Sequence, residues 1–152
     1  MRAVSFPELT FSPWISWGNH LEFPLIKCPG VYLVAISSIN LEGELPSFAD
    51  VHYVGMTVSK GGLAQRWRNF DRAINDSNGK HSGGRRILKA LGPYSKWERE
   101  LFVSAFAIDA KFQETSVKNL ITKGIVTYLE YETMAKVFTK TGKLPEFNIL
   151  GR

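Results

Sequence analysis

The sequence predicts an α/β fold of the α+β type, in which a small, mostly antiparallel sheet of three strands is flanked by helices. Three short segments, at 30–36, 51–56 and 97–108, are rich in β-branched and aromatic residues, which is typical of strands. Other stretches repeat their apolar residues with the period of a helix. The first two strands are joined by a single loop, so we expect them to pair antiparallel. A chain of 152 residues fits one domain.

The segment 1–28 is predicted to be an arm packed on the core, and residues 29–152 to form the domain itself. The arm is rich in aromatic residues and prolines and has no clear period. Pro29-Gly30 is a turn signal, and the strand that follows it is apolar on both faces, as in a fully buried strand. The polar stretch 37–50, which holds a glycine and a proline, is predicted to be a loop.

A helix is predicted over 63–74, because its apolar residues fall on one face at helical period. Those residues are Leu63, Trp67, Phe70 and Ile74. The glycine- and serine-rich stretch 76–84 is predicted to be a loop, and a short helix is expected at 85–91.

A longer helix is predicted over 113–138, after a third strand whose apolar side chains alternate between two faces. Gly124 marks an expected break or weak point in that helix. Its expected apolar stripe consists of Val117, Leu120, Ile121, Ile125, Tyr128 and Leu129.

Positive charge is concentrated in one part of the chain. Residues 60–89 carry eight cations against two carboxylates, which leaves +6, whereas the whole chain carries +5. Localised positive charge is typical of a surface that binds a polyanion, so we expect this segment to contact the phosphate backbone of DNA. A solvated helix face is the alternative. Besides Arg66, the cations expected to contact DNA are Lys60, Arg68, Arg72, Lys80, Arg85, Arg86 and Lys89.

Several classes of protein are excluded or disfavoured. The single cysteine, Cys28, rules out an intrachain disulfide and a cysteine-based zinc site, and it is expected to be a small buried hydrophobe. The sequence has no P-loop, HExxH or GxSxG motif. Residues 1–13 have no basic region followed by an apolar run, so we expect no signal peptide. No apolar run reaches the ~18 residues that a membrane span needs. We therefore expect a cytoplasmic, intracellular protein without a membrane partner.

The candidate catalytic residues occur in a definite order along the chain. Two tripeptides open it, one in each of the first two strands, and a helical arginine, a helical glutamate and a late asparagine follow. These are Gly30-Val31-Tyr32, Tyr53-Val54-Gly55, Arg66, Glu130 and Asn148. The order resembles the GIY-YIG nuclease superfamily, in which the tripeptides lie on neighbouring antiparallel strands. The resemblance covers about residues 29–148.

The resemblance implies a metal-dependent endonuclease that hydrolyses phosphodiester bonds in DNA. Glu130 would hold one divalent ion, Mg²⁺ or alternatively Mn²⁺, because a hard cation that keeps its waters needs few protein ligands. The planar fork of Arg66 would bind phosphate oxygens. The chain has no separate DNA-reading module, so a compact restriction-type enzyme fits, with specificity arising in this domain or in a homodimer.

The resemblance also implies roles for the remaining residues. Tyr32 would be the general base or would orient the attacking water, since a nearby arginine or metal lowers a tyrosine pKa from about 10. Tyr53 would support that water or the phosphate, and Asn148 would fix the site through side-chain hydrogen bonds.

The sequence departs from the family pattern in three ways. Valine takes the place of isoleucine in both tripeptides, at Val31 and Val54, and keeps a β-branched strand residue there. Loop 37–50 makes the spacing between the tripeptides long, so it looks like an insertion. The histidine or tyrosine that the family has one turn after the arginine is replaced by Phe70, and His81 is the candidate to take its place.

Two choices between neighbouring residues stay open at this level, because Arg68 can replace Arg66 and Glu132 can replace Glu130. The missing histidine also supports another reading, a nucleic-acid-binding module that has the nuclease fold but does not cleave. A structural or protein-interaction domain is a third.

Overall fold

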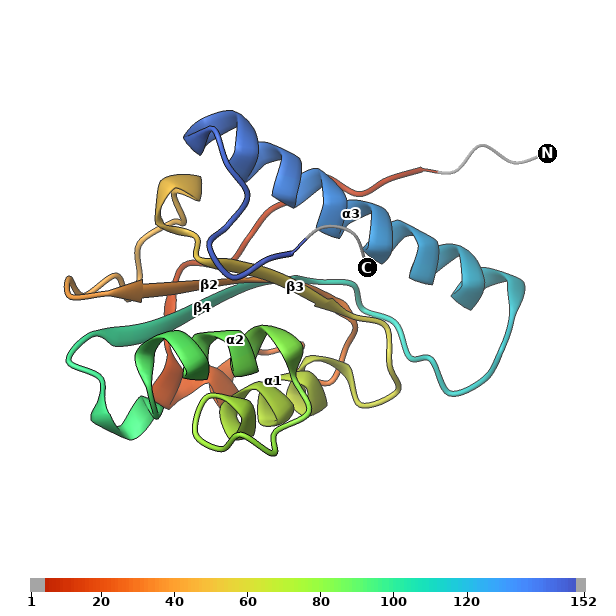
Figure 1. Cartoon of the computed structure of the whole chain (residues 1–152). Coiled ribbons are helices and arrows are strands. Elements are labelled where there is room, and N and C mark those ends of the chain that lie inside the picture. The colour runs from red at the N-terminus through yellow and green to blue at the C-terminus, as the bar shows by residue number, and fades with distance from the viewer. Residues whose placement is uncertain (1–4, 150–152) are drawn as a thin grey trace.

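The computed structural model describes residues 5–149, which form one sheet with helices on both faces (Figure 1). The strands lie in the order β1-β4-β2-β3, and every pair is antiparallel. Their bounds are β1 Ile15–Ser16, β2 Gly30–Ser37, β3 Tyr53–Thr57 and β4 Glu100–Ala107. The α+β class is therefore confirmed. Residues 1–4 of the expected arm and 150–152 of the expected domain lie outside the described residues.

The sheet has four strands rather than the three expected. The additional strand, β1, comes from the segment 1–28 and pairs with β4 through Ile15↔Val103 and Ser16↔Phe102. Two residues are too few to show an alternating pattern, so only pairing with β4 reveals this strand.

Three α-helices enclose the sheet: α1 (Gly62–Ala73) and α2 (Ser82–Leu91) cover one face, and α3 (Val117–Thr141) covers the other (Figure 1). Three short 3₁₀ turns complete the described structure, η1 at Trp17–Glu22, η2 at Phe48–Asp50 and η3 at Tyr94–Lys96. Among the described residues, no helix is long and apolar enough to cross a membrane.

Strand β2 separates two hydrophobic cores, because its side chains alternate between the faces. Tyr32, Val34 and Ile36 face α1 and α2, while Val31, Leu33 and Ala35 belong to the core under α3. The expectation of a strand buried on both faces is confirmed. The four residues expected on one face of the first helix, Leu63, Trp67, Phe70 and the C-cap residue Ile74, are all fully buried.

The segment that precedes β2 contributes to both cores. Trp17 and Phe23 are buried on the α1 side, and Trp14 is buried on the α3 side. The main chain of Trp14 also exchanges two hydrogen bonds with loop 37–50, at Gly43 and Glu44. The segment and the loop therefore support each other on the core.

Helix α2 begins at Ser82, three residues before the expected start, so the expected loop 76–84 is shorter. Gly83 and Gly84 suggested a loop, yet both lie in the first turn of α2. These two positions are glycines because close neighbours leave no room for a side chain. A Cβ at Gly83 would overlap the Tyr53 ring, and one at Gly84 would overlap Ala73.

Helix α3 differs from its expected form in two respects. It continues through Gly124 without a break, because the packing of its second half outweighs the roughly 1 kcal/mol that one glycine costs a helix. The expected stripe is also largely wrong. Val117, Leu120, Ile121 and Tyr128 are exposed, whereas Val126, Leu129, Thr133, Met134 and Val137 are buried. A helix of 25 residues, about 38 Å long, exceeds a strand of eight residues, about 27 Å, so one end overhangs the sheet.

Candidate active site at the edge of the sheet

Tyr32 and Tyr53 lie on neighbouring strands and point to the same face of the sheet. Tyr32 is paired with Gly55 and Val34 with Tyr53, so the two tyrosines are diagonal neighbours, with ring centroids 6.2 Å apart. Both side chains belong to the core that faces α1 and α2. The expected arrangement of the two tripeptides on adjacent strands is thus present.

Gly55 and Gly83 create the space for these two rings. A Cβ at Gly55 would overlap the ring and the hydroxyl of Tyr32, which leans across β3 at this point. Gly83, in the first turn of α2, does the same for the Tyr53 ring. Because β3 is the edge strand, the Tyr32 hydroxyl comes to the edge of the sheet. The second tripeptide therefore needs glycine at position 55, because any side chain there would overlap Tyr32.

Arg66 interacts by charge and by hydrogen bonding with the hydroxyls of both Tyr32 and Tyr53. It lies on α1 and is half-buried. Burial alone would lower the pKa of the guanidinium, but the two tyrosines beside it raise that pKa, so Arg66 is a permanent cation. Among the described residues, Arg66 Nε is a buried nitrogen without a hydrogen-bond partner. Arg68, in contrast, is exposed, so the structure brings Arg66 to the tyrosines.

His81 contacts the Tyr32 hydroxyl, with 2.7 Å between Nε2 and Oη. It is also the N-cap residue of α2, where Nδ1 accepts a hydrogen bond of 3.0 Å from the Gly84 N–H. The proton of the neutral ring must then sit on Nε2, which donates to Tyr32. Burial, followed by the charges of Arg66 and Arg86, lowers the His81 pKa to about 3. His81 is therefore a neutral donor at ordinary pH.

The pKa of Tyr32 is raised well above its usual value of 10.0, chiefly by burial and secondly by Tyr53. Arg66 lowers this pKa, as expected from the sequence, but its effect is smaller than that of burial. Glu130 adds a further increase. The expected net lowering of the Tyr32 pKa is therefore wrong for the protein alone, in which Tyr32 is a neutral phenol.

The two hydroxyls do not line an open cleft. Tyr32 is 0% and Tyr53 2% exposed, because α1 and α2 cover them. The pocket beside them, of about 420 Å³, is formed by the end of β3 and by α1, and Arg66 lines it. Arg66 thus connects the buried tyrosines with an accessible pocket.

Glu130 approaches the same tyrosine from the opposite face of the sheet. It is half-buried on α3, one turn from the buried residues Val126 and Met134. The negative charge of Glu130 raises the pKa of Tyr32, and Glu132 has no such effect among the groups that shift this pKa. Within residues 5–149, no group of three or more His, Cys, Asp or Glu side chains is arranged to hold a metal ion. Glu130 is a half-buried carboxylate whose charge raises the pKa of Tyr32.

Asn148 is bonded to the main chain of the edge strand β3. Its side-chain amide accepts a hydrogen bond from the Val54 N–H and donates one to the Val54 carbonyl, each 2.8 Å long. The Phe147 N–H also bonds to the His52 carbonyl, and Arg86 Nε donates to the Phe147 carbonyl at 2.8 Å. Asn148 thereby fixes the strand that carries Tyr53, which is the kind of role expected for it.

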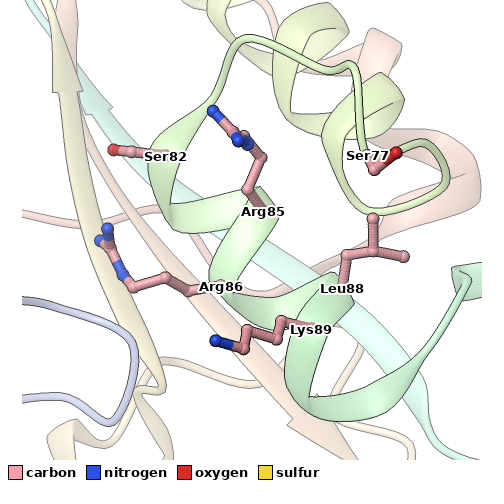
Figure 2. A pocket seen from close by; sticks show the side chains of 6 residues that line it. All are labelled: Ser77, Ser82, Arg85, Arg86, Leu88 and Lys89. Atoms are coloured by element: carbon pink, nitrogen blue, oxygen red, sulfur yellow. The ribbon is translucent and has the colours of Figure 1, made fainter.

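The expected DNA-binding cations are divided between separate surfaces. Arg85, Arg86 and Lys89, on α2, line a pocket of about 550 Å³ (Figure 2). Lys60 and Arg68 line a different pocket, and Arg72 and Lys80 are exposed outside both. Arg86 is half-buried and bonded to the main chain at Phe147, so only part of its side chain is accessible.

Comparison of the chain with protein-family models, with curated proteins and with solved structures finds no match.

Proposed function

We propose that this chain is a metal-dependent DNA endonuclease of the GIY-YIG type that hydrolyses phosphodiester bonds. The observation that supports this most is the sharing of the Arg66 guanidinium by Tyr32 and Tyr53 at the edge of the sheet, with Glu130 acting on the same tyrosine. These four residues come from β2, β3, α1 and α3, and they are separated widely in the sequence. Convergence of an arginine, a carboxylate and two phenols on one edge suits phosphoryl transfer better than a purely structural role.

In this proposal, Arg66 binds the scissile phosphate from the pocket it lines, since its planar fork matches two phosphate oxygens. His81 donates a hydrogen bond to the Tyr32 hydroxyl and so orients the phenol. A divalent ion bound at Glu130 would stabilise the charge that develops on the phosphate and on the leaving oxygen.

Tyr32 is the group that would accept the proton of the attacking water. Its hydroxyl receives hydrogen bonds from His81 and Arg66, and both favour the phenolate. Of the groups that raise its pKa, Glu130 is the one whose charge a bound cation offsets.

A second candidate function is nucleic-acid binding without cleavage. The burial of both tyrosines, 0% and 2% exposed, favours this reading, because a general base must reach water. The two functions share the basic surface and differ in whether the buried hydroxyl takes part in chemistry.

A plasmid-nicking assay in Mg²⁺ distinguishes the two functions. We expect the wild type to nick supercoiled DNA and Glu130→Gln to lose this activity while still binding DNA. Glu132→Gln is the matched control, two positions along the same helix, and should retain activity. Binding without nicking by the wild type would favour the second function, and equal nicking by Glu130→Gln and the wild type would remove Glu130 from the site.

A further inference from the structure

The pocket that Lys60 and Arg68 line has a volume of about 390 Å³ and lies on α1, next to the pocket that Arg66 lines. It is called the second pocket below. Four cations line this second pocket, and they come from three separate parts of the chain: Lys27 before β2, Lys60 and Arg68 around the start of α1, and Lys111 after β4. Of the described residues that line the two pockets, none is a carboxylate. Lys27 and Lys111 lie outside the basic segment 60–89, so its charge pattern does not reveal them.

The pocket is held in place by main-chain contacts. The N–H groups of Leu63 and Ala64, in the first turn of α1, donate to the carbonyls of Cys28 and Ile26, on either side of Lys27. Gly62, with a φ of +62°, allows this approach, since a Cβ there would overlap the Lys27 carbonyl. These contacts occupy two donors at the start of α1 with protein oxygens. An anion in this pocket is therefore bound mainly by the side-chain cations.

The position of Lys111 is fixed by its neighbour. Phe112 is 5% exposed, and the Lys123 ammonium lies 5.3 Å from the centre of its ring. Asp109, two residues before Lys111, lies with a carboxylate oxygen 4.0 Å from Cys28 Sγ and does not line the pocket. The four cations thus face one concave surface without a neutralising carboxylate in its wall.

Gln65 lines both pockets, so they are adjacent on a surface that runs from Arg66 to Lys111. Four like charges gathered in one concavity repel one another, and binding of a polyanion relieves that repulsion. We infer that Lys27, Lys60, Arg68 and Lys111 bind the phosphate backbone of a nucleic acid one or more nucleotides away from the phosphate held by Arg66. The inference rests on the proposed function, because it takes nucleic acid as the ligand.

The test compares the salt dependence of DNA binding by the wild type and by Lys27→Ala/Lys111→Ala. Affinity for a short fluorescent duplex is measured by anisotropy in EDTA, so that no cleavage occurs. Each phosphate contact contributes about 0.9 to the slope of log affinity against log salt. Loss of two contacts should therefore make the rise in Kd between about 50 and 200 mM salt about 12-fold smaller than in the wild type. Lys27→Arg/Lys111→Arg should restore the wild-type dependence.

Lys118→Ala/Lys140→Ala is the control, because it removes the same charge from exposed positions on α3. Its slope should remain close to that of the wild type. Equal slopes for the wild type and Lys27→Ala/Lys111→Ala would overturn the inference and leave the proposed nuclease untouched. A wild type that fails to bind DNA at low salt would overturn both. Activity in Glu130→Gln, in contrast, would count against the proposed metal site alone, since binding is measured without metal.

Discussion

The Nε2 atom of His81 lies 2.7 Å from the hydroxyl of Tyr32, although the two residues are 49 positions apart in the chain and both are fully buried. The direction of this hydrogen bond follows from the other ring nitrogen, because Nδ1 already accepts the Gly84 N–H. His81 is thus at once the N-cap of α2 and a donor to the candidate catalytic phenol. This double role couples the start of a helix to the chemistry expected at the sheet edge.

Replacing Tyr32 with Phe should lower the nicking rate in Mg²⁺ by about 10²–10⁴, because only a positioned proton-transfer group is lost. The buried Nε2–H of His81 would also lose its partner, so the free energy of unfolding should fall by about 1–3 kcal/mol. Tyr53→Phe is the comparison and should slow nicking less. The measurements are nicking rates and urea unfolding. Wild-type nicking by Tyr32→Phe would remove Tyr32 from the mechanism.

His81→Asn and His81→Ala separate the two roles of this residue. Asparagine can still accept the Gly84 N–H as an N-cap, but it cannot reach the Tyr32 hydroxyl as Nε2 does. We expect both variants to nick DNA more slowly than the wild type. His81→Ala should also be less stable than His81→Asn by about 0.5–2 kcal/mol, the usual worth of an N-cap. Full activity in His81→Asn would show that the bond to Tyr32 is dispensable.

Acid should destabilise the fold through His81. Its pKa is about 3 in the folded chain, against 6.5 for an ordinary histidine, so the unfolded chain takes up a proton first as the pH falls. This contribution to stability is fully present above pH 6.5 and is lost as the pH falls towards 3, at up to about 1.4 kcal/mol per pH unit. Urea unfolding from pH 7 to 5 measures it. His81→Asn should show a shallower decline than the wild type, and parallel curves for the two would contradict the assignment of a neutral, buried His81.

Gly55→Ala should disturb the site, whereas Gly124→Ala should not. The new methyl group at Gly55 would overlap the Tyr32 ring, which is enclosed and cannot move freely, so both stability and nicking should fall. No atom lies within 4 Å of the position of a Cβ at Gly124, so alanine there should raise helix stability by as much as about 1 kcal/mol. Thermal unfolding and the nicking assay test the pair. A tolerated Gly55→Ala would mean that the Tyr32 ring does not occupy this space in solution.

Much of the secondary structure follows from local patterns in the sequence. The strands β2, β3 and β4 lie within about three residues of their expected bounds, and α1 lies within one. These elements repeat apolar side chains at a period of 2 or 3.6, which depends only on near neighbours in the chain. The order of the tripeptides, Arg66, Glu130 and Asn148 along the chain is likewise a property of the sequence alone, and it predicts the candidate site residues.

Contacts between segments that are distant in the sequence could not be predicted from local patterns and are seen only in the tertiary structure. A two-residue strand at Ile15–Ser16 exists because β4 offers it an edge, and α2 starts at Ser82 because Gly83 fits beneath Tyr53. The choice of Arg66 over Arg68 depends on which side of α1 faces the tyrosines. Neither position carries a local signal that separates it from the other.

The sequence by itself therefore determined the class of fold and the set of residues that could carry chemistry. The tertiary structure decided their state, because burial and the approach of side chains remote in sequence set hydrogen bonds and pKa values. It placed His81 against Tyr32, kept both tyrosines from solvent behind Arg66, and brought Lys27 and Lys111 to one pocket. Each of these relationships joins segments whose separation along the chain says nothing about their separation in space.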